Sequence, residues 1–421
     1  MTSSAVRSPP RPRAWRRHWR PRSPTRWPAT AIRTSSRCRR TAEVWASRSP
    51  PTATAGPRGS RPTCSAAGAR DSRRRRRPRC RSRRCRACSA SSRRAASISS
   101  ATTSWWDIDP SKHRLMVNGS DEKMLRKPMV FTLDEIMRLP SVSRFHFIEC
   151  GANTGMEWGN VAVPTCQYSH GMISCSEFTG VPLKILLDLC GADWKRGRFV
   201  LAEGADGSSM TRTIPRSLID SGEVLVAYGQ NGEMLRPENG YPLRLVVPGV
   251  QGVSWVKYLR RIELGDQPYG AKDEVIHYID LMPGGLHRQY SSLQEVKSVV
   301  TTPSGGQVLL DKGYYNVSGL AWSGRGKVKK VDVSVDGGRN WRQARLEGMA
   351  MSKCLTRFNI DWTWDGKPAL VMSRATDETG HVQSNYSQLR AVRGSRSIYH
   401  NNAIQTWLVE ESGEVRNVQL A

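Results

Sequence analysis

The pattern of hydrophobic and polar positions divides residues 107–294 into short strands and helices that alternate along the chain. Runs rich in β-branched and aromatic residues, bounded by glycine, proline and asparagine, predict strands at 113–119, 198–206, 223–232 and 243–249. Apolar residues at helical spacing, with start and stop signals at their ends, predict helices at 132–140, 181–191 and 215–222. This alternation favours a mixed α/β domain, and an α+β fold class overall.

The pattern changes at about residue 295. Strand-like segments separated by turns follow one another at 296–303, 314–323, 327–338, 341–348, 354–364, 368–378 and 384–390. Asp336-Gly337-Gly338 is a hairpin turn, and no segment of this half carries a convincing helix signal. The sequence therefore predicts an immunoglobulin-like β-sandwich at 295–410, followed by a tail at 411–421.

A strand that leads into a glycine-rich loop lies at Phe145–Gly155. Phe145, Phe147 and Ile148 predict a buried strand that ends at Cys150, and Gly-Ala-Asn-Thr-Gly follows as a loop. A cysteine at the end of a strand can hold a metal as a thiolate. From these residues alone, a buried and inert cysteine is the alternative, since cysteine is among the most buried residue types.

Charge separates the first hundred residues from the rest of the chain. Of the 65 basic residues, 28 are arginines in residues 1–100, which contain no lysine and only two acids, Glu43 and Asp71. The remaining 37 basic and 34 acidic residues nearly cancel, so the net charge of +29 belongs mainly to this segment. Lacking leucine, phenylalanine and tyrosine, residues 1–104 cannot build a core, and we expect them to be disordered.

Three interpretations of this arginine-rich segment are open. It could bind nucleic acid or an anionic surface, and Cys85 to Cys88 have the spacing of a metal-binding pair. Its composition, however, is typical of a GC-rich gene translated out of frame, which we favour, so that no nucleic-acid partner is expected. Arg16-Arg17 is not followed by an apolar run of export-signal length, and no stretch of the chain approaches the length of a membrane span.

Four segments between residue 107 and the end of the chain are informative together: FIECGANTG, HGMISCSEFTGVPLKILLDLCG, NGYPLRLVVPGVQGVSWVKYLRRIEL and VSGLAWSGRGKVKKVDVSVDGGRNWRQA. Through these segments, the chain from about residue 107 to its end resembles the sulfite oxidase family of molybdenum enzymes. Within the family, SVSRFHFIEC, TRTIP and NNAIQTW are most similar to the sulfane dehydrogenases of bacterial sulfur-oxidising systems. The resemblance implies a molybdopterin-binding domain at 105–294, a dimerisation domain at 295–410, and molybdenum and molybdopterin as cofactors.

The resemblance also implies a role for individual residues. Cys150 is expected to be the thiolate ligand of molybdenum, and Tyr278 to be the active-site tyrosine that donates a hydrogen bond to an oxo group or to substrate. The residues expected to contact the pterin or its phosphate are Asn153, Asp206, Arg244, Ser254 and Lys257. A loop-capping role is the alternative for Asp206, and a buried, inert thiol is expected at Cys175.

The sequence departs from the family where sulfite oxidases bind their substrate. Thr154 and Gly155 stand in place of arginines that bind the sulfite dianion, and Tyr168 stands near the place of a pocket tryptophan. This predicts an arginine-poor pocket, which suits a sulfane sulfur tethered to a carrier protein better than a free dianion.

The expected function is therefore oxo transfer to a sulfane sulfur on a carrier protein, with electrons passed to a c-type cytochrome by a periplasmic homodimer. A sulfite:cytochrome c dehydrogenase, an inactive dimerising scaffold that lacks part of the cofactor site, and a nucleic-acid-binding protein are the alternatives.

Overall fold

The computed structural model describes residues 108–159, 162–282, 285, 287–289, 293–394 and 399–419, all within one compact unit. Two predictions concern residues outside the described ranges: the disorder of residues 1–104 and the Cys85–Cys88 pair. None of the helices in the described ranges is long and apolar enough to cross a membrane.

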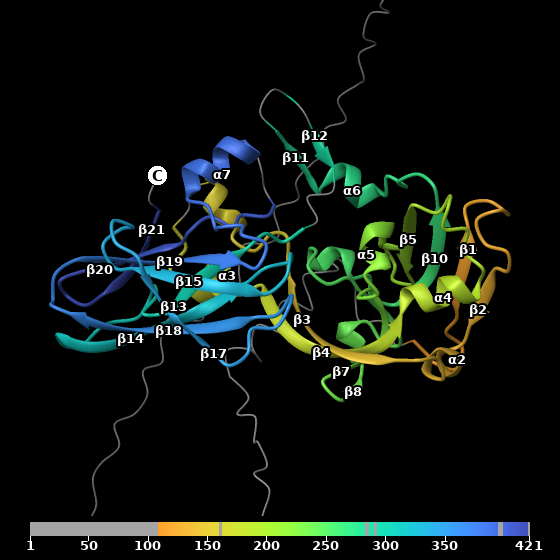
Figure 1. Cartoon of the computed structure of the whole chain (residues 1–421), viewed down its shortest axis with the longest axis horizontal. Coiled ribbons are helices and arrows are strands. Elements are labelled where there is room, and N and C mark those ends of the chain that lie inside the picture. Colours follow the sequence, from red (N-terminus) through yellow and green to blue (C-terminus); the bar gives the residue numbers. More distant parts are fainter. Residues whose placement is uncertain are drawn as a thin grey trace, which may run out of the picture. The chain divides into compact units, whose positions relative to one another are not determined.

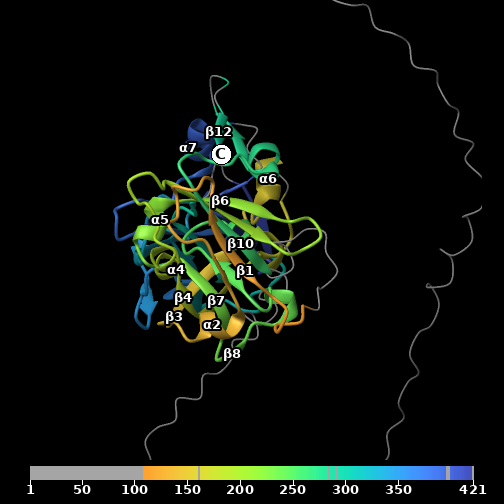
Figure 2. The ribbon, with the colours of Figure 1, turned by 90° about the vertical axis from the view of Figure 1, so that its right-hand side faces the viewer.

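The first domain contains two five-stranded sheets. One has the order β2 (Met129–Phe131), β1 (Leu115–Gly119), β10 (Leu259–Gly265), β5 (Phe199–Gly204) and β6 (Thr211–Pro215). The other has the order β3 (Val142–Glu149), β4 (Ile173–Pro182), β7 (Leu225–Gln230) and β8 (Glu233–Met234), with β9 (Arg244–Val246) also paired to β7. Only β1 and β10 are parallel. Figure 2 shows β3, β4 and β7 as one group, and β1, β10 and β6 as the other.

Short helices connect these strands; three of them lie where the sequence predicts helices, and the helices at 166–170 and 272–276 were not predicted. They are α2 (Leu133–Met137), α3 (Cys166–His170), α4 (Leu183–Leu189), α5 (Arg216–Asp220) and α6 (Lys272–Ile276), with 3-10 turns η1 (Gly155–Gly159), η2 (Pro237–Asn239) and η3 (Gly252–Ser254). Thr132 and Glu135 form a capping box that begins α2. The helix predicted at 181–191 starts later, at Leu183, because β4 continues through Pro182.

The second domain is the predicted sandwich, which confirms the fold class (Figure 1). One sheet has the order β13 (Lys297–Thr302), β14 (Gly313–Trp322), β18 (Thr356–Trp364) and β17 (Arg345–Glu347). The other has the order β16 (Arg342–Gln343), β15 (Val328–Ser334), β19 (Ala369–Asp377), β20 (Thr406–Val409) and β21 (Val415–Val418). A two-stranded ribbon, β11 (Ile279–Leu281) with β12 (His287–Gln289), precedes the sandwich.

Two expectations for this domain are wrong. Residues 384–390 are not a strand, because α7 (Tyr386–Arg393) begins there, with Asn385 and Gln388 forming a capping box. Residues 411–421 are not a free tail, because β21 pairs with β20 along its whole length and so completes a sheet.

Strand β3 belongs to the cores of both domains. Its side chains alternate between two faces, as in any strand. Ile148 packs into the core of the first domain, whereas Phe147 packs with the sandwich core around Trp322 and Phe358. The strand that leads to Cys150 is therefore fixed from both sides.

Candidate active site

The loop after β3 folds back on itself directly after Cys150. The Cys150 amide donates to Met172 O (3.0 Å), and the Asn153 amide donates to Cys150 O (3.0 Å). Thr154 has a φ of +64°, a backbone conformation that residues other than glycine rarely adopt, and this conformation closes the turn. Burial, followed by the nearby charge of Glu149, raises the pKa of the half-buried Cys150 thiol to about 11. A bound cation would displace that proton and stabilise the thiolate.

A second glycine loop lies directly against this one. A Cβ atom on Gly151 would come within 2.8 Å of the Gln251 side chain. On Gly252 it would lie 3.1 Å from Glu149 O. The loop that carries Cys150 and the PGVQG loop, about one hundred residues later, therefore meet through backbone that has no room for side chains.

Arg244 and Lys257 form a buried basic cradle beside this loop. Arg244 Nη1 donates to Asn239 O (3.2 Å), but its Nε and Nη2 have no hydrogen-bond partner among the described residues, and burial lowers its pKa to about 10. Lys257 Nζ donates to Glu238 O (3.1 Å), and burial, reinforced by the charge of Arg244, lowers its pKa to about 8. Two buried cations, of which Arg244 has unused donors, fit an anion such as the phosphate of a pterin.

Glycines again allow the close approach that shapes this cradle. Gly240 has a φ of +101°, and a Cβ atom there would lie 2.7 Å from Lys257 Cβ. A Cβ atom on Gly204 would lie 2.8 Å from Asp206 Oδ1. Both residues therefore hold the chain near Lys257 in a conformation that larger residues would disturb.

Two of the predicted pterin contacts are engaged within their own loops. Asp206 Oδ1 accepts from the Met210 amide (3.0 Å) and Oδ2 from Ser208 Oγ (2.6 Å), which are loop-capping contacts. Asn153 Nδ2 donates to Glu149 Oε1 (2.9 Å), and its Oδ1 accepts from the Met172 amide (3.2 Å). These side chains shape the loops, and their contact with a pterin stays a prediction.

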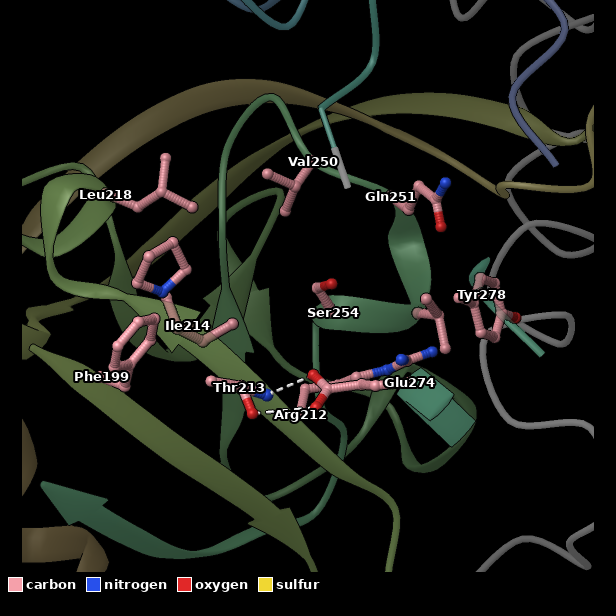
Figure 3. Close-up of a pocket in the computed structure, with 12 residues that line it drawn as sticks. Phe199, Arg212, Thr213, Ile214, Leu218, Val250, Gln251, Ser254, Glu274 and Tyr278 are labelled. Atoms are coloured by element: carbon pink, nitrogen blue, oxygen red, sulfur yellow. Dashed lines mark hydrogen bonds between the residues drawn. The ribbon is translucent and has the colours of Figure 1, made fainter. Parts of the chain in front are cut away.

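A cavity of about 90 Å³ brings Ser254 and Tyr278 together with Arg212 (Figure 3). The Arg212 guanidinium lies 4.3 Å from the centre of the Tyr278 ring, and Tyr399 stacks on the same ring at 4.4 Å. Thr213, the neighbour of Arg212 on β6, is fixed by Glu274. The Glu274 carboxylate accepts hydrogen bonds from the Thr213 amide and from Thr213 Oγ1 (2.8 Å). The cavity therefore offers a phenol and a buried cation side by side.

Arg212 bears on the arginine-poor pocket that the sequence suggests, which stays a prediction. Thr154 and Gly155 do leave the loop without arginine, and Thr154 Oγ1 is used within the protein, donating to Asn401 O (2.6 Å). Arg212 nevertheless lines the cavity from β6. Apart from its place in the quoted TRTIP segment, no local pattern in the sequence distinguishes this arginine from a surface one.

The sandwich also contributes to the site, through residues 399–402. The His400 amide donates to Gly151 O (2.8 Å), and its Nδ1 contacts Gln294 Oε1 (2.8 Å). Glu295 contacts His400 Nε2 (3.3 Å), and this bond, together with Arg393, holds the pKa of Glu295 well below its usual range. The NNAIQTW segment was the only signal of this contribution in the sequence.

Cys175 and Tyr168 lie apart from these contacts. The Cys175 side chain is in hydrogen-bond contact with Cys354, whose Sγ donates to Phe145 O (2.8 Å). Tyr168, on α3, is 58% exposed and does not line the cavity around Tyr278. Within the described ranges, no three His, Cys, Asp or Glu side chains are grouped to hold a metal.

Comparison with known proteins identifies two domains in this chain. An oxidoreductase molybdopterin binding domain matches residues 102–272, and a Mo-co oxidoreductase dimerisation domain matches residues 289–407. The chain belongs to the sulfite oxidase family of molybdenum oxidoreductases, whose cofactor is molybdenum bound to molybdopterin.

Particular relatives place the chain within this family. The crystal structure of the sulfane dehydrogenase SoxCD from Paracoccus pantotrophus is 46% identical, with a TM-score of 0.72, over 75% of this chain and 80% of that one. Sulfite oxidase of Gallus gallus is 33% identical, over 57% of this chain and 55% of its own. NADH nitrate reductase of Solanum lycopersicum is 29% identical, over 62% of this chain and 33% of its own. The chain thus spans 55% and 33% of the length of these two curated relatives.

Proposed function

We propose that this protein is a molybdenum-dependent sulfane dehydrogenase. It oxidises sulfane sulfur held on a carrier protein, works in the periplasm as a homodimer, and passes electrons to a c-type cytochrome. The observation that carries the proposal is the 46% identity to a sulfane dehydrogenase over most of both chains. It is supported by the arginine-free loop at Thr154 and Gly155.

In this proposal, the bound molybdenum centre supplies two-electron redox chemistry and oxo transfer, which side chains cannot perform. Cys150 holds the metal, while Arg244 and Lys257 bind the cofactor phosphate. Tyr278 donates a hydrogen bond to an oxygen that gains negative charge, and the buried Arg212 beside it stabilises that charge.

Arg212 gives the proposed pocket a preference for sulfur groups that become anionic. A sulfane sulfur gains oxygens as it is oxidised, and each added oxygen is a further acceptor of charge-assisted hydrogen bonds. One guanidinium suits the anionic end of a tethered chain, whereas the family's sulfite site uses several arginines.

A sulfite:cytochrome c dehydrogenase is the second candidate, favoured by the similarity to sulfite oxidases and by the cation of Arg212.

The test that separates the two candidates is cytochrome c reduction by the purified, molybdenum-loaded protein. Carrier protein charged with thiosulfate is compared with free sulfite at equal concentration. Higher kcat/KM for the charged carrier supports the proposal, and a higher value for sulfite supports the second candidate. Protein that binds molybdenum but oxidises neither substrate contradicts both.

A further inference from the structure

A buried ion pair connects the metal-ligand loop to the sandwich. Glu149 is the last residue of β3 and directly precedes Cys150, whereas Lys297 is the first residue of β13. Lys297 Nζ lies 3.0 Å from Glu149 Oε1, and both side chains are only 2% exposed. The pair therefore joins the two domains at the position next to the ligand cysteine.

The carboxylate of Glu149 accepts hydrogen bonds from both domains. Oε1 accepts from Asn153 Nδ2 (2.9 Å), in the ligand loop, as well as from Lys297. Oε2 accepts from Trp322 Nε1 (2.8 Å), in β14. Both oxygens are thus satisfied, so Glu149 is held in one position despite its burial.

Lys297 is held equally firmly and reaches the far end of the same loop. Its Nζ donates to Thr154 Oγ1 (2.9 Å) and lies 5.7 Å from the centre of the Trp322 ring. Thr154 is the residue with positive φ that closes the turn. One ammonium group therefore contacts both ends of the loop that contains Cys150.

The charges of the pair also bear on the metal. A buried carboxylate next to a thiolate ligand would add negative charge to the site and would be costly without a partner. Lys297 cancels this charge in a region where little water screens it. Charge close to a metal centre is one of the means by which a protein sets its reduction potential.

We propose that Lys297 is a positioning residue of the sandwich domain that neutralises Glu149 and holds Thr154, and thereby sets the geometry and reduction potential of the metal bound by Cys150. The proposal rests on Cys150 being the metal ligand, as the proposed function requires. It is independent of which sulfur compound is the substrate.

The experiment compares K297M, E149Q, the double variant E149Q/K297M and the charge-retaining K297R in the full chain. The readouts are molybdenum content, circular dichroism, and the reduction potential of the bound metal from a redox titration followed by electron paramagnetic resonance. We expect K297M to leave the Glu149 carboxylate unpaired and to lower the reduction potential of the metal. We expect E149Q to leave the Lys297 ammonium unpaired and to raise the reduction potential. The double variant and K297R stay close to the wild type.

Opposite shifts in the two single variants distinguish charge compensation from a loss of packing, which would shift both potentials in the same direction. If K297M alone binds no molybdenum, the double variant E149Q/K297M tests the charge pairing. Recovered molybdenum content in the double variant supports the pairing, and a folded double variant without molybdenum overturns it. Unchanged potentials in both single variants also overturn it. Cys150→Ser protein with wild-type turnover would instead refute the ligand assignment on which the proposed function rests.

Discussion

At the scale of single residues, Cys150 provides the most direct test of the site. We expect Cys150→Ser to lose turnover but to keep its fold, because serine is nearly isosteric with cysteine, while its hydroxyl is a harder and far less acidic ligand. Steady-state kinetics and circular dichroism of the purified variant check both parts. Wild-type activity in the serine variant would contradict the assignment.

Arg212 is expected to act on substrate rather than on cofactor. Arg212→Met should lower kcat/KM by about 10- to 100-fold, the loss of a hydrogen bond to a charged group, with molybdenum content unchanged. Arg212→Lys keeps the charge and should recover part of the loss. Arg196→Met, at an exposed ion pair with Asp121, is the matched control. Steady-state kinetics at wild-type values for Arg212→Met would remove this arginine from the pocket's chemistry.

Lys257 should make cofactor binding depend on pH. Its pKa of about 8 lies below the ordinary lysine value, so in the cofactor-free protein it loses its proton as pH rises through 8. A bound phosphate favours the charged form and raises this pKa. Affinity for the cofactor should therefore fall as pH rises above 8. Reconstitution between pH 6.5 and 9.5 measures the slope, which Lys257→Gln should flatten; an equal slope in that variant would assign it to another group.

The sequence predicts Cys150, Arg244 and Lys257 as site residues because each lies in a segment that resembles the family, and their roles stay predictions. It did not identify Arg212 or Lys297. Their roles come from neighbours that are distant along the chain, such as Tyr278 and Glu149, and no spacing within one segment encodes such contacts.

At the scale of elements, most strands and helices follow the hydrophobic pattern. Two errors lie in polar segments near the C-terminus. Residues 384–390 contain only two apolar residues, Tyr386 and Leu389, which are too few to separate a strand from a helix by pattern, and the cap formed by Asn385 and Gln388 begins a helix there. Strand β21 is short, and its pairing with β20 is what makes these residues a strand.

Strand β21 should contribute to stability. Val415 is 2% exposed and packs in the sandwich core, so Val415→Ala should lower the free energy of unfolding by roughly 1–3 kcal/mol. The matched control is Val382→Ala, since Val382 is 50% exposed and should tolerate truncation. Denaturant unfolding of both variants makes the comparison. Equal stabilities would mean that residues 411–421 act as the tail that the sequence suggested.

At the scale of the whole molecule, both domain types are predictable from the sequence, but the contact between them is not. Of the tryptophans in the described sandwich, Trp322, Trp362, Trp364 and Trp407 lie in its core, and Trp341 is half-buried outside it. The most exposed apolar side chains of the described sandwich are Leu310 and Met349, each 87% exposed.

The proposed homodimer should depend on apolar surface of this kind. We expect the full chain to sediment as a dimer at micromolar concentration. At least one of Leu310→Glu and Met349→Glu should raise the dimer dissociation constant, whereas Met234→Glu, on β8 of the first domain, should not. A monomeric wild-type protein in analytical ultracentrifugation would refute the dimer. Unchanged dissociation constants in both sandwich variants would place the interface elsewhere.

The hydrogen bond from the His400 amide to Gly151 O affects the order in which synthesis, folding and cofactor insertion can occur. A ribosome makes the ligand loop long before it makes residue 400, yet the loop needs that amide, and Lys297, for its final contacts. During synthesis, the loop therefore exists without the partners that fix its shape. Cofactor insertion into a finished site has to wait until the last strands of the sandwich have left the ribosome and folded.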